Sequence, residues 1–587
     1  MKKYLVTTSD ERTWPKDKEQ PIVFLGEWCK LYSKKEKWQS LDSKTLPYHW
    51  NDREKLYSDH QSVRATYEKT LSTLAEELNF IHQVDYSLRY WRILIGPWLW
   101  RFIQVLFDRW SMLEIAFSDN KEYYCFVTRQ DCSLFVPNDM KSFIELFTKD
   151  DWNEAIYGQL ITSYWANKVE ITWVDREFSN LKENLDGGVK GYIKKIITFY
   201  NRLLVKDENY FFISSYLPLK TELKLQISLG QAPNIWLSES LDAVSYDNDQ
   251  RQWKLNIEPS NDFEHVVEKM VPLHIPTIYI EGYEMLNTTI KKLPWPKNPK
   301  AIFTSNSHMW DDVFKAWSAK KIESGVPLVI GQHGGSYGVS LFSWSEEHEV
   351  KISDRWLSWG WFDEHRENIT PIGNLKVISR NASYNPRGFA LMLEWTASRY
   401  TDGINPGALA SQWLDYFNDQ KLFLTELSDK LQGEVLLRLY PLDFDWKQAS
   451  RWRDVMPEVA IDLGTKNMRK MIQESRVLIS TYNATTFLES LTWNVPTIIF
   501  WNPKHWELRE QAQPYFDMLE SAGIFHVTPQ SAAQQMTRVW DDIDSWWKSD
   551  KVQQARNIFI EQYSATPENS LDLLRGTFEK VANEASI

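Results

Sequence analysis

Hydroxyl and amide side chains gather in one short turn, where they could hydrogen-bond a phosphate or a sugar. Apolar runs at 477–479 and 497–500 flank this turn and predict two buried parallel strands. Ligands of open α/β sheets bind beyond the carboxyl ends of the strands, next to the following helix N-terminus, so the segment predicts half of a nucleotide site. The alternative is a plain strand–helix–strand unit with a polar surface turn. The candidate binding residues are Ser480, Tyr482, Asn483, Thr485, Thr486 and, about one helical turn later, Glu489.

A second candidate site is the sequence GQHGGSYG at 331–338. The paired glycines Gly334 and Gly335 let the backbone approach a ligand closely, while His333 and Tyr337 supply polar contacts. His333 could donate to a phosphate oxygen of a departing nucleotide or act as general base toward an acceptor hydroxyl. The loop is not a phosphate-binding P-loop, because no Gly-Lys-Ser or Gly-Lys-Thr follows. A tight turn with a surface histidine is the alternative.

Arg438 lies late in the apolar strand predicted at 434–439, so its guanidinium should emerge at the carboxyl edge of a sheet and could clamp a phosphate. Asp443 follows and is a further candidate for contact with the nucleotide ligand. Since a charge in a buried strand is costly without a partner, the alternative is an ion pair of Arg438 with Asp443 or Asp445.

Two carboxylates follow predicted strands in the N-terminal half. Glu27 comes after a strand at 21–25, and Glu281 after a strand at 277–280. If both project into one cleft, one could serve as base or nucleophile for transfer through an oxocarbenium-like state. Each alone fits a surface acid or a helix cap better than a catalyst. The Asp443–Asp445 pair follows an arginine that suits phosphate, so we expect no obligatory metal and no other cofactor.

Composition narrows the class of protein. The chain has 587 residues, a net charge of −12 and 43% hydrophobic residues, which is typical of a globular protein too long for one core. The negative charge disfavours nucleic-acid binding. Three cysteines without a metal-ligand spacing and an N-terminus without an apolar leader predict a cytoplasmic protein. The apolar stretch 91–107 contains Arg92, Pro97 and Arg101, so we predict a core helix there and no membrane span.

Alternating strand and helix patterns predict an α/β fold. We expect an N-terminal Rossmann-like domain over 1–383, with a helical insertion at about 52–117, and a second Rossmann-like domain over 384–549. The turn-rich segment after Ile378 suits the linker between the two doubly wound domains. Residues 550–587 are predicted to form terminal helices, broken near Pro567.

Taken together, five motifs resemble a bacterial transferase family associated with O-antigen and surface-polysaccharide gene clusters. These motifs are TTSDERTW, FLGEWCKLY at 24–32, GQHGGSYG, LRLYPLDFDW at 437–446 and STYNATTFLESLTWNVPTIIFW at 480–501. More distantly, the His-Gly loop, the Arg438 strand and the hydroxyl-rich turn are similar to those of capsule-type ulosonic acid transferases. They are also similar to those of polyol-phosphate polymerases, although Arg438-Leu439-Tyr440-Pro441 lacks the second histidine common in these polymerases.

The resemblance implies a metal-independent glycosyltransferase of GT-B-like fold, with two doubly wound domains facing a cleft. It implies a nucleotide-sugar donor, with a CMP-linked ulosonic or nonulosonic acid favoured, and a glycan or lipid-linked acceptor. The enzyme would work in the cytoplasm, and peripheral contact with the inner face of the membrane is compatible with that. The alternatives are a hexose transferase using a UDP, GDP or dTDP donor, a polyol-phosphate transferase, and a non-catalytic glycan-binding protein.

Overall fold

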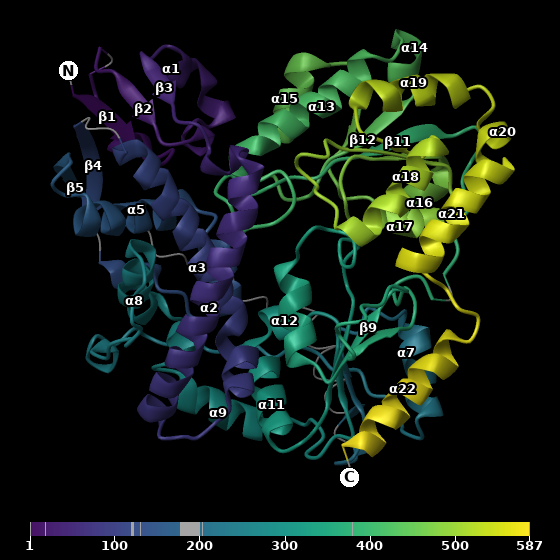
Figure 1. Cartoon of the computed structure of the whole chain (residues 1–587), viewed down its shortest axis with the longest axis horizontal. Helices are drawn as coiled ribbons and strands as arrows, with labels where there is room; N and C mark the ends of the chain where they lie inside the picture. Colours follow the sequence, from purple (N-terminus) through teal and green to yellow (C-terminus); the bar gives the residue numbers. More distant parts are fainter. Residues whose placement is uncertain are drawn as a thin grey trace.

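Three parallel β-sheets organise the chain in the computed structural model (Figure 1). The structure describes residues 2–17, 19–118, 122–129, 131–175, 200–201, 203–378 and 380–585. All strand pairs within the sheets are parallel, which confirms the predicted α/β class. The region 1–383 contributes two of the sheets, whereas the sequence had indicated one.

Sheet 1 has the order β3-β2-β1-β4-β5. Its strands are β1 (Lys3–Val6), β2 (Ile22–Phe24), β3 (Ser43–Thr45), β4 (Tyr123–Arg129) and β5 (Val169–Asp175). The chain runs outward from β1 to one side and then returns to the other, so the strand order reverses between β1 and β4. At that reversal the hydroxyls of Thr7 and Thr8 donate to the carboxylate of buried Glu154, at 3.2 and 2.8 Å.

Two long helices, α2 (Arg53–His82) and α3 (Leu88–Phe117), form the layer that the sequence predicted as a helical insertion. They pack against each other, and α3 is buried on nearly all sides. Its buried Arg92, Asp108 and Arg109 interrupt the apolar surface. Among the described residues, no helix has the length and apolarity needed to cross a membrane.

Sheet 2 has the order β10-β9-β8-β7-β6. Its strands are β6 (Phe211–Ile213), β7 (Ile302–Thr304), β8 (Leu328–Gly331), β9 (Arg355–Ser358) and β10 (Ile369–Pro371), and the connecting helices include α8 (Asp262–His274), α9 (Tyr283–Lys291), α11 (Asp312–Glu323) and α12 (Trp344–Ile352). The strand predicted at 277–280 is wrong. Residues Thr277–Tyr279 form a 3-10 helix after Pro276, and the N–H groups of Thr277 and Ile278 bond to the carbonyls of Pro137 and Asn138.

Sheet 3 has the order β13-β12-β11-β14-β15-β16. Its strands are β11 (Phe389–Leu393), β12 (Val435–Arg438), β13 (Ala460–Asp462), β14 (Ser475–Ser480), β15 (Thr497–Phe500) and β16 (Phe525–His526). Helices α13 (Trp413–Thr425), α15 (Gln448–Val455), α17 (Thr485–Thr492), α18 (Gln513–Ser521) and α19 (Pro529–Val539) accompany it. The strand order reverses between β11 and β14, and in such sheets the reversal marks the ligand crevice.

The chain crosses twice between the regions of sheets 2 and 3. After β10 it passes Arg380, whose carbonyl accepts from the indole of Trp493. It returns between α21 (Asp550–Tyr563), which packs on α17 and α18, and α22 (Ser570–Glu584), which packs on α7 (Leu219–Ser228) (Figure 1). At this second crossing Ser564 hydrogen-bonds Thr492 and Asn374. Both crossings therefore lie beside the end of α17.

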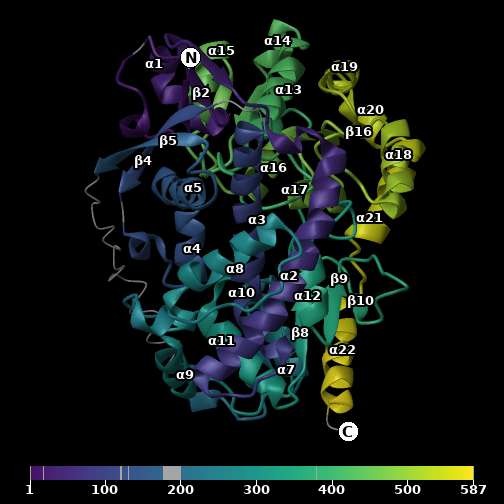
Figure 2. The same cartoon turned by 60° about the vertical axis from the view of Figure 1, so that its left-hand side comes forward.

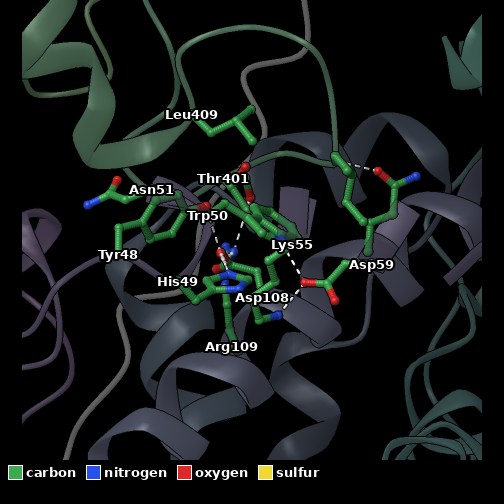
Figure 3. A network of polar contacts seen from close by, with 12 residues as sticks. Tyr48, His49, Trp50, Asn51, Lys55, Asp59, Asp108, Arg109, Thr401 and Leu409 are labelled. Carbon is green, nitrogen blue, oxygen red and sulfur yellow. Dashed lines mark hydrogen bonds and ion pairs between the residues drawn. The ribbon is translucent and has the colours of Figure 1, made fainter. Parts of the chain in front are cut away.

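A buried polar network joins the helical layer to the segment after β11 (Figure 3). Asp108 accepts from the hydroxyl of Tyr48 at 2.8 Å, contacts Nε2 of His49 at 3.0 Å and pairs with Arg109 at 2.8 Å. Arg109 also donates to the carbonyl of Thr401. Burial acts to raise the pKa of Asp108, but these three partners together lower it below its ordinary value. The carboxylate therefore stays charged in the interior.

Candidate functional site

The two predicted polar loops meet at the facing carboxyl ends of sheets 2 and 3. A Cβ added to Gly335, in the loop after β8, would lie 2.5 Å from the carbonyl oxygen of Ala484, in the turn after β14. Nδ2 of Asn483 donates to the hydroxyl of Ser340 across the same contact, at 3.4 Å. Gly335 is thus required for close backbone approach, and segments about 150 residues apart build one site.

His333 lies in this loop beside the buried carboxylate of Glu349 on α12. Nδ1 of His333 is 3.5 Å from Oε1 of Glu349, and the hydroxyl of Tyr337 lies 3.2–3.3 Å from the imidazole nitrogens. Tyr337 donates to Glu349 at 2.7 Å, and the indole of Trp356 donates to it at 3.0 Å. The His333 side chain is 22% exposed while that of Glu349 is fully buried, so the imidazole is the member of the group that a ligand can reach.

The charges of His333 and Glu349 affect each other's pKa values. Burial raises the pKa of Glu349 to about 7, although His333, Tyr337 and Trp356 act in the opposite direction. Burial lowers the pKa of His333, against the effect of Glu349. His308, on α10 (Ser307–Trp310), is a further neighbour, with Nε2 3.3 Å from Glu349. At neutral pH a neutral His333 can therefore accept a proton, with Glu349 placed to stabilise the resulting charge.

On the other side of the site, Lys376 forms an ion pair with Glu489 of α17, with 2.9 Å between Nζ and Oε1. The Lys376 ammonium also lies over the ring of Tyr216, at 5.8 Å, and that ring is 5.9 Å from the ring of His333. Neither Lys376 nor Tyr216 was predicted as a site residue from the sequence. The one sequence feature that could have indicated them is their position, because each follows a strand of sheet 2 by a few residues.

A cavity of about 220 Å³ lies where the strand order of sheet 3 reverses. Trp395 and Ser398 follow β11, Tyr482 and Asn483 follow β14, and Trp506 follows β15; all five line it. The Ser398 hydroxyl and Oδ1 of Asn483 are buried without a hydrogen-bond partner. Aromatic rings and unmatched polar atoms suit a ligand ring that carries hydroxyl groups. Sequence reasoning identified Tyr482 and Asn483 but missed Trp395, Ser398 and Trp506.

The other residues of the hydroxyl-rich turn serve its local structure. Ser480 donates to the carbonyl of Tyr482 at 3.3 Å, and Thr486 hydrogen-bonds the Tyr482 side chain. Thr485 and Thr486 open α17, whose N-cap residue, Ala484, makes no side-chain capping bond. The first N–H groups of α17 are thus left for a ligand or water.

Arg438 is buried and paired, but not with either aspartate named from the sequence. Its guanidinium donates to Asp462 of β13 at 2.9 Å and to the carbonyl of Gly464 at 3.0 Å. Asp443 accepts from the N–H groups of Lys447 and Gln448, both at 2.8 Å, and so fixes the start of α15. The strand neighbour β13 supplies the partner because Arg438 and Asp462 are in register.

Of the two carboxylates of the N-terminal half, only Glu27 follows a strand, as predicted. Glu281 follows the 3-10 helix, its side chain is 3% exposed, and Arg251 holds it bidentately at 2.6 and 2.8 Å. Glu27 begins a 3-10 helix after β2 and pairs with Lys30 at 2.8 Å. Glu281 thus has the surroundings of a structural ion pair.

Comparison with protein families identifies a family of transferases. A family model described as "LIC12162 family transferase" matches residues 3–578. No curated protein matches. Among solved structures, the chain is similar to one titled "Crystal Structure of WaaG, a glycosyltransferase involved in lipopolysaccharide biosynthesis", at 11% identity and a TM-score of 0.28, covering 64% of this chain and 98% of that one. Among the described residues, no cluster of three or more His, Cys, Asp or Glu side chains is arranged to hold a metal ion.

Proposed function

The chain belongs to the LIC12162 family of transferases, and we propose that it is a glycosyltransferase of GT-B-like organisation that moves a sugar from a nucleotide donor to a surface-glycan or lipid-linked acceptor. The observation that carries the proposal is the contact of Gly335 with Ala484, which joins the His333 loop to the hydroxyl-rich turn. We assign the donor mainly to 384–549 and the acceptor to 1–383, with 550–587 as helices that bridge the two.

The donor phosphate would lie between the start of α17 and Lys376. The uncapped N–H groups of α17 favour an anion, and the Lys376 ammonium adds a full positive charge. In the structure Glu489 is paired with Lys376. Once a phosphate binds the Lys376 ammonium instead, the Glu489 carboxylate can accept hydrogen bonds from ribose hydroxyls. The cavity beside Tyr482 and Asn483 would then hold one ring of the donor.

In the transfer step His333 would act as general base. The proton of the acceptor hydroxyl moves to Nε2 of His333 while the acceptor oxygen bonds to the anomeric carbon. The bond between that carbon and the nucleotide phosphate breaks, and the electron pair leaves with the phosphate. The buried carboxylate of Glu349 holds the Nδ1 side of the imidazole and stabilises the positive charge that develops on the ring.

A CMP-linked ulosonic or nonulosonic acid is our preferred donor. Such a donor carries one phosphate, and Lys376 offers a single cationic group, which suits one phosphate better than a diphosphate. Arg438 adds little here, because Asp462 already neutralises it at 2.9 Å.

A thermal-shift panel of CMP, CDP, UDP, GDP and dTDP tests the proposal. A ligand that binds only the folded state adds roughly 2.7 kcal/mol at 100 times its dissociation constant. We expect selective stabilisation by CMP that is lost in Glu489→Ala. Preference for a diphosphate nucleotide would redirect the assignment to hexose donors. In a separate turnover assay, release of CMP from a CDP-polyol would indicate polyol-phosphate transfer. No shift with any nucleotide would favour a glycan-binding protein without catalysis.

A further inference from the structure

We propose that a second cavity, of about 710 Å³, binds a neutral carbohydrate and is the acceptor site of this transferase. Its role as acceptor site rests on the proposed function, whereas its binding chemistry does not. The cavity lies between α2, the loop at 361–366, the segment 509–515 and the end of α21. Figure 2 shows α2 running beside α12, with the 361–366 loop projecting after β9. Its volume falls in the range of small-molecule sites.

The cavity is continuous in its lining with the cavity at the reversal of sheet 3. Phe342 and Ser343 line both. A ligand in the larger cavity would therefore contact the same two side chains as the proposed donor ring. This adjacency is what an acceptor needs, because its reacting hydroxyl must approach the donor sugar.

Most of the charged side chains that line the cavity already have partners of opposite charge. Buried Glu346 binds both Arg366, at 2.9 Å, and Arg509, at 3.0 Å. Glu347 pairs with Arg64 at 3.4 Å. An anionic ligand would have to displace these carboxylates, whereas a neutral polyol can hydrogen-bond to guanidinium donors and carboxylate acceptors without breaking a pair.

Aromatic rings supply the apolar faces that a sugar ring requires. Phe362 is 61% exposed and Tyr57 is 45% exposed, and both line the cavity. The Tyr57 ring lies 6.1 Å from that of Phe342, which itself stacks on His60 at 4.1 Å. Exposed rings beside paired charges are the combination that stacks on C–H faces and bonds hydroxyl groups of a pyranose.

Saturation-transfer NMR and calorimetry on the full chain test this site with lactose, maltose, cellobiose and N,N′-diacetylchitobiose, and with 3′-sialyllactose as the anionic counterpart of lactose. We expect at least one neutral disaccharide to bind. Phe362→Ala and Tyr57→Ala should each weaken that binding about fivefold to tenfold, as loss of one aromatic contact implies. Phe80→Ala is the matched control, since Phe80 is 82% exposed on α2 and does not line the cavity.

Three results would overturn the site: no neutral disaccharide binds, Phe362→Ala leaves the affinity unchanged, or sialyllactose binds more tightly than lactose. The nucleotide shifts of Phe362→Ala and Tyr57→Ala should equal those of the unaltered chain. Sugar binding without any nucleotide shift would keep the carbohydrate site and refute the transferase proposal, so the two failures are distinguishable.

Discussion

The carboxylate of Glu349 lies 3.5 Å from Nδ1 of His333 and is fully buried behind it. Tyr337 and Trp356 hold the carboxylate in place through donated hydrogen bonds. This arrangement places a fixed, buried carboxylate beside Nδ1 of the imidazole, as an orienting carboxylate stands beside a catalytic histidine.

Glu349→Gln should lower kcat about 100-fold and leave the KM for the donor within about twofold, because the amide fills the same space but cannot stabilise an imidazolium. The pKa of Glu349, about 7, should appear as an acidic limb in the pH profile of the native enzyme and disappear in the variant. Release of nucleotide from the donor, followed from pH 5.5 to 9, measures both effects. Exposed Glu76→Gln is the control, and an unchanged kcat in Glu349→Gln would rule out the orienting role.

Gly335→Ala should force the His333 loop away from α17, since the new Cβ would meet the backbone of Ala484 and Thr485 at 2.5–2.9 Å. We expect a loss of about 1–3 kcal/mol in the free energy of unfolding and a smaller nucleotide-induced shift. Urea denaturation and the thermal-shift assay measure these quantities. Gly576→Ala, with no atom within 4 Å of its Cβ, should not destabilise the chain. Equal behaviour of the two variants would contradict the close contact.

Lys376→Met should weaken binding of CMP about tenfold or more, the effect of losing one charge-assisted hydrogen bond to phosphate. Isothermal titration of the full chain gives the dissociation constants. Lys470→Met removes a lysine whose side chain is 75% exposed and should bind CMP normally. Unchanged affinity in Lys376→Met would place the phosphate elsewhere.

Glu394→Gln should stabilise the protein at alkaline pH. Burial raises the pKa of Glu394 to about 8, and one carboxylate oxygen accepts only from Trp452 while the other has no partner. A folded-state pKa above the unfolded value makes stability fall as pH rises from about 4.5 to 8, by at most about 5 kcal/mol at 1.4 kcal/mol per pKa unit. The variant should therefore match the native chain near pH 4.5 and exceed it above pH 8. A constant difference across this range would refute the shift.

Asp108→Asn should destabilise the fold by about 3–5 kcal/mol, because it leaves the buried guanidinium of Arg109 without its carboxylate. The pKa of Asp108 is lowered, so its contribution is present above pH 4 and is lost as the pH falls through the folded-state value. Unfolding of the two chains in urea at pH 7 measures the difference, with exposed Asp85→Asn as the control. A difference below about 1 kcal/mol would show that the network is not electrostatically coupled.

Periodicity and turn chemistry predicted most of the secondary structure, including β11 at 389–393 and the helices at 52–117. The segment 277–280 was predicted as a strand, but its residues Thr277–Tyr279 form a 3-10 helix. A short buried apolar segment after a proline has the same composition in a strand and in a 3-10 helix, so composition does not separate the two. The two polar loops were identified by residue type. Lys376, Glu349 and Trp395 were not, since their role depends on which strand ends and helices the tertiary fold brings together.

The two crossings of the chain, at Arg380 and at Ser564, lie at one corner, beside Trp493 and Thr492. Because both covalent links lie at one corner, a rotation about that corner is the relative movement of sheets 2 and 3 that disturbs the path of the chain least. The end of α17 then moves little, while the atoms furthest from the corner travel most. A small ligand bound at this corner would therefore displace the far ends of sheets 2 and 3 by more than it displaces the corner itself.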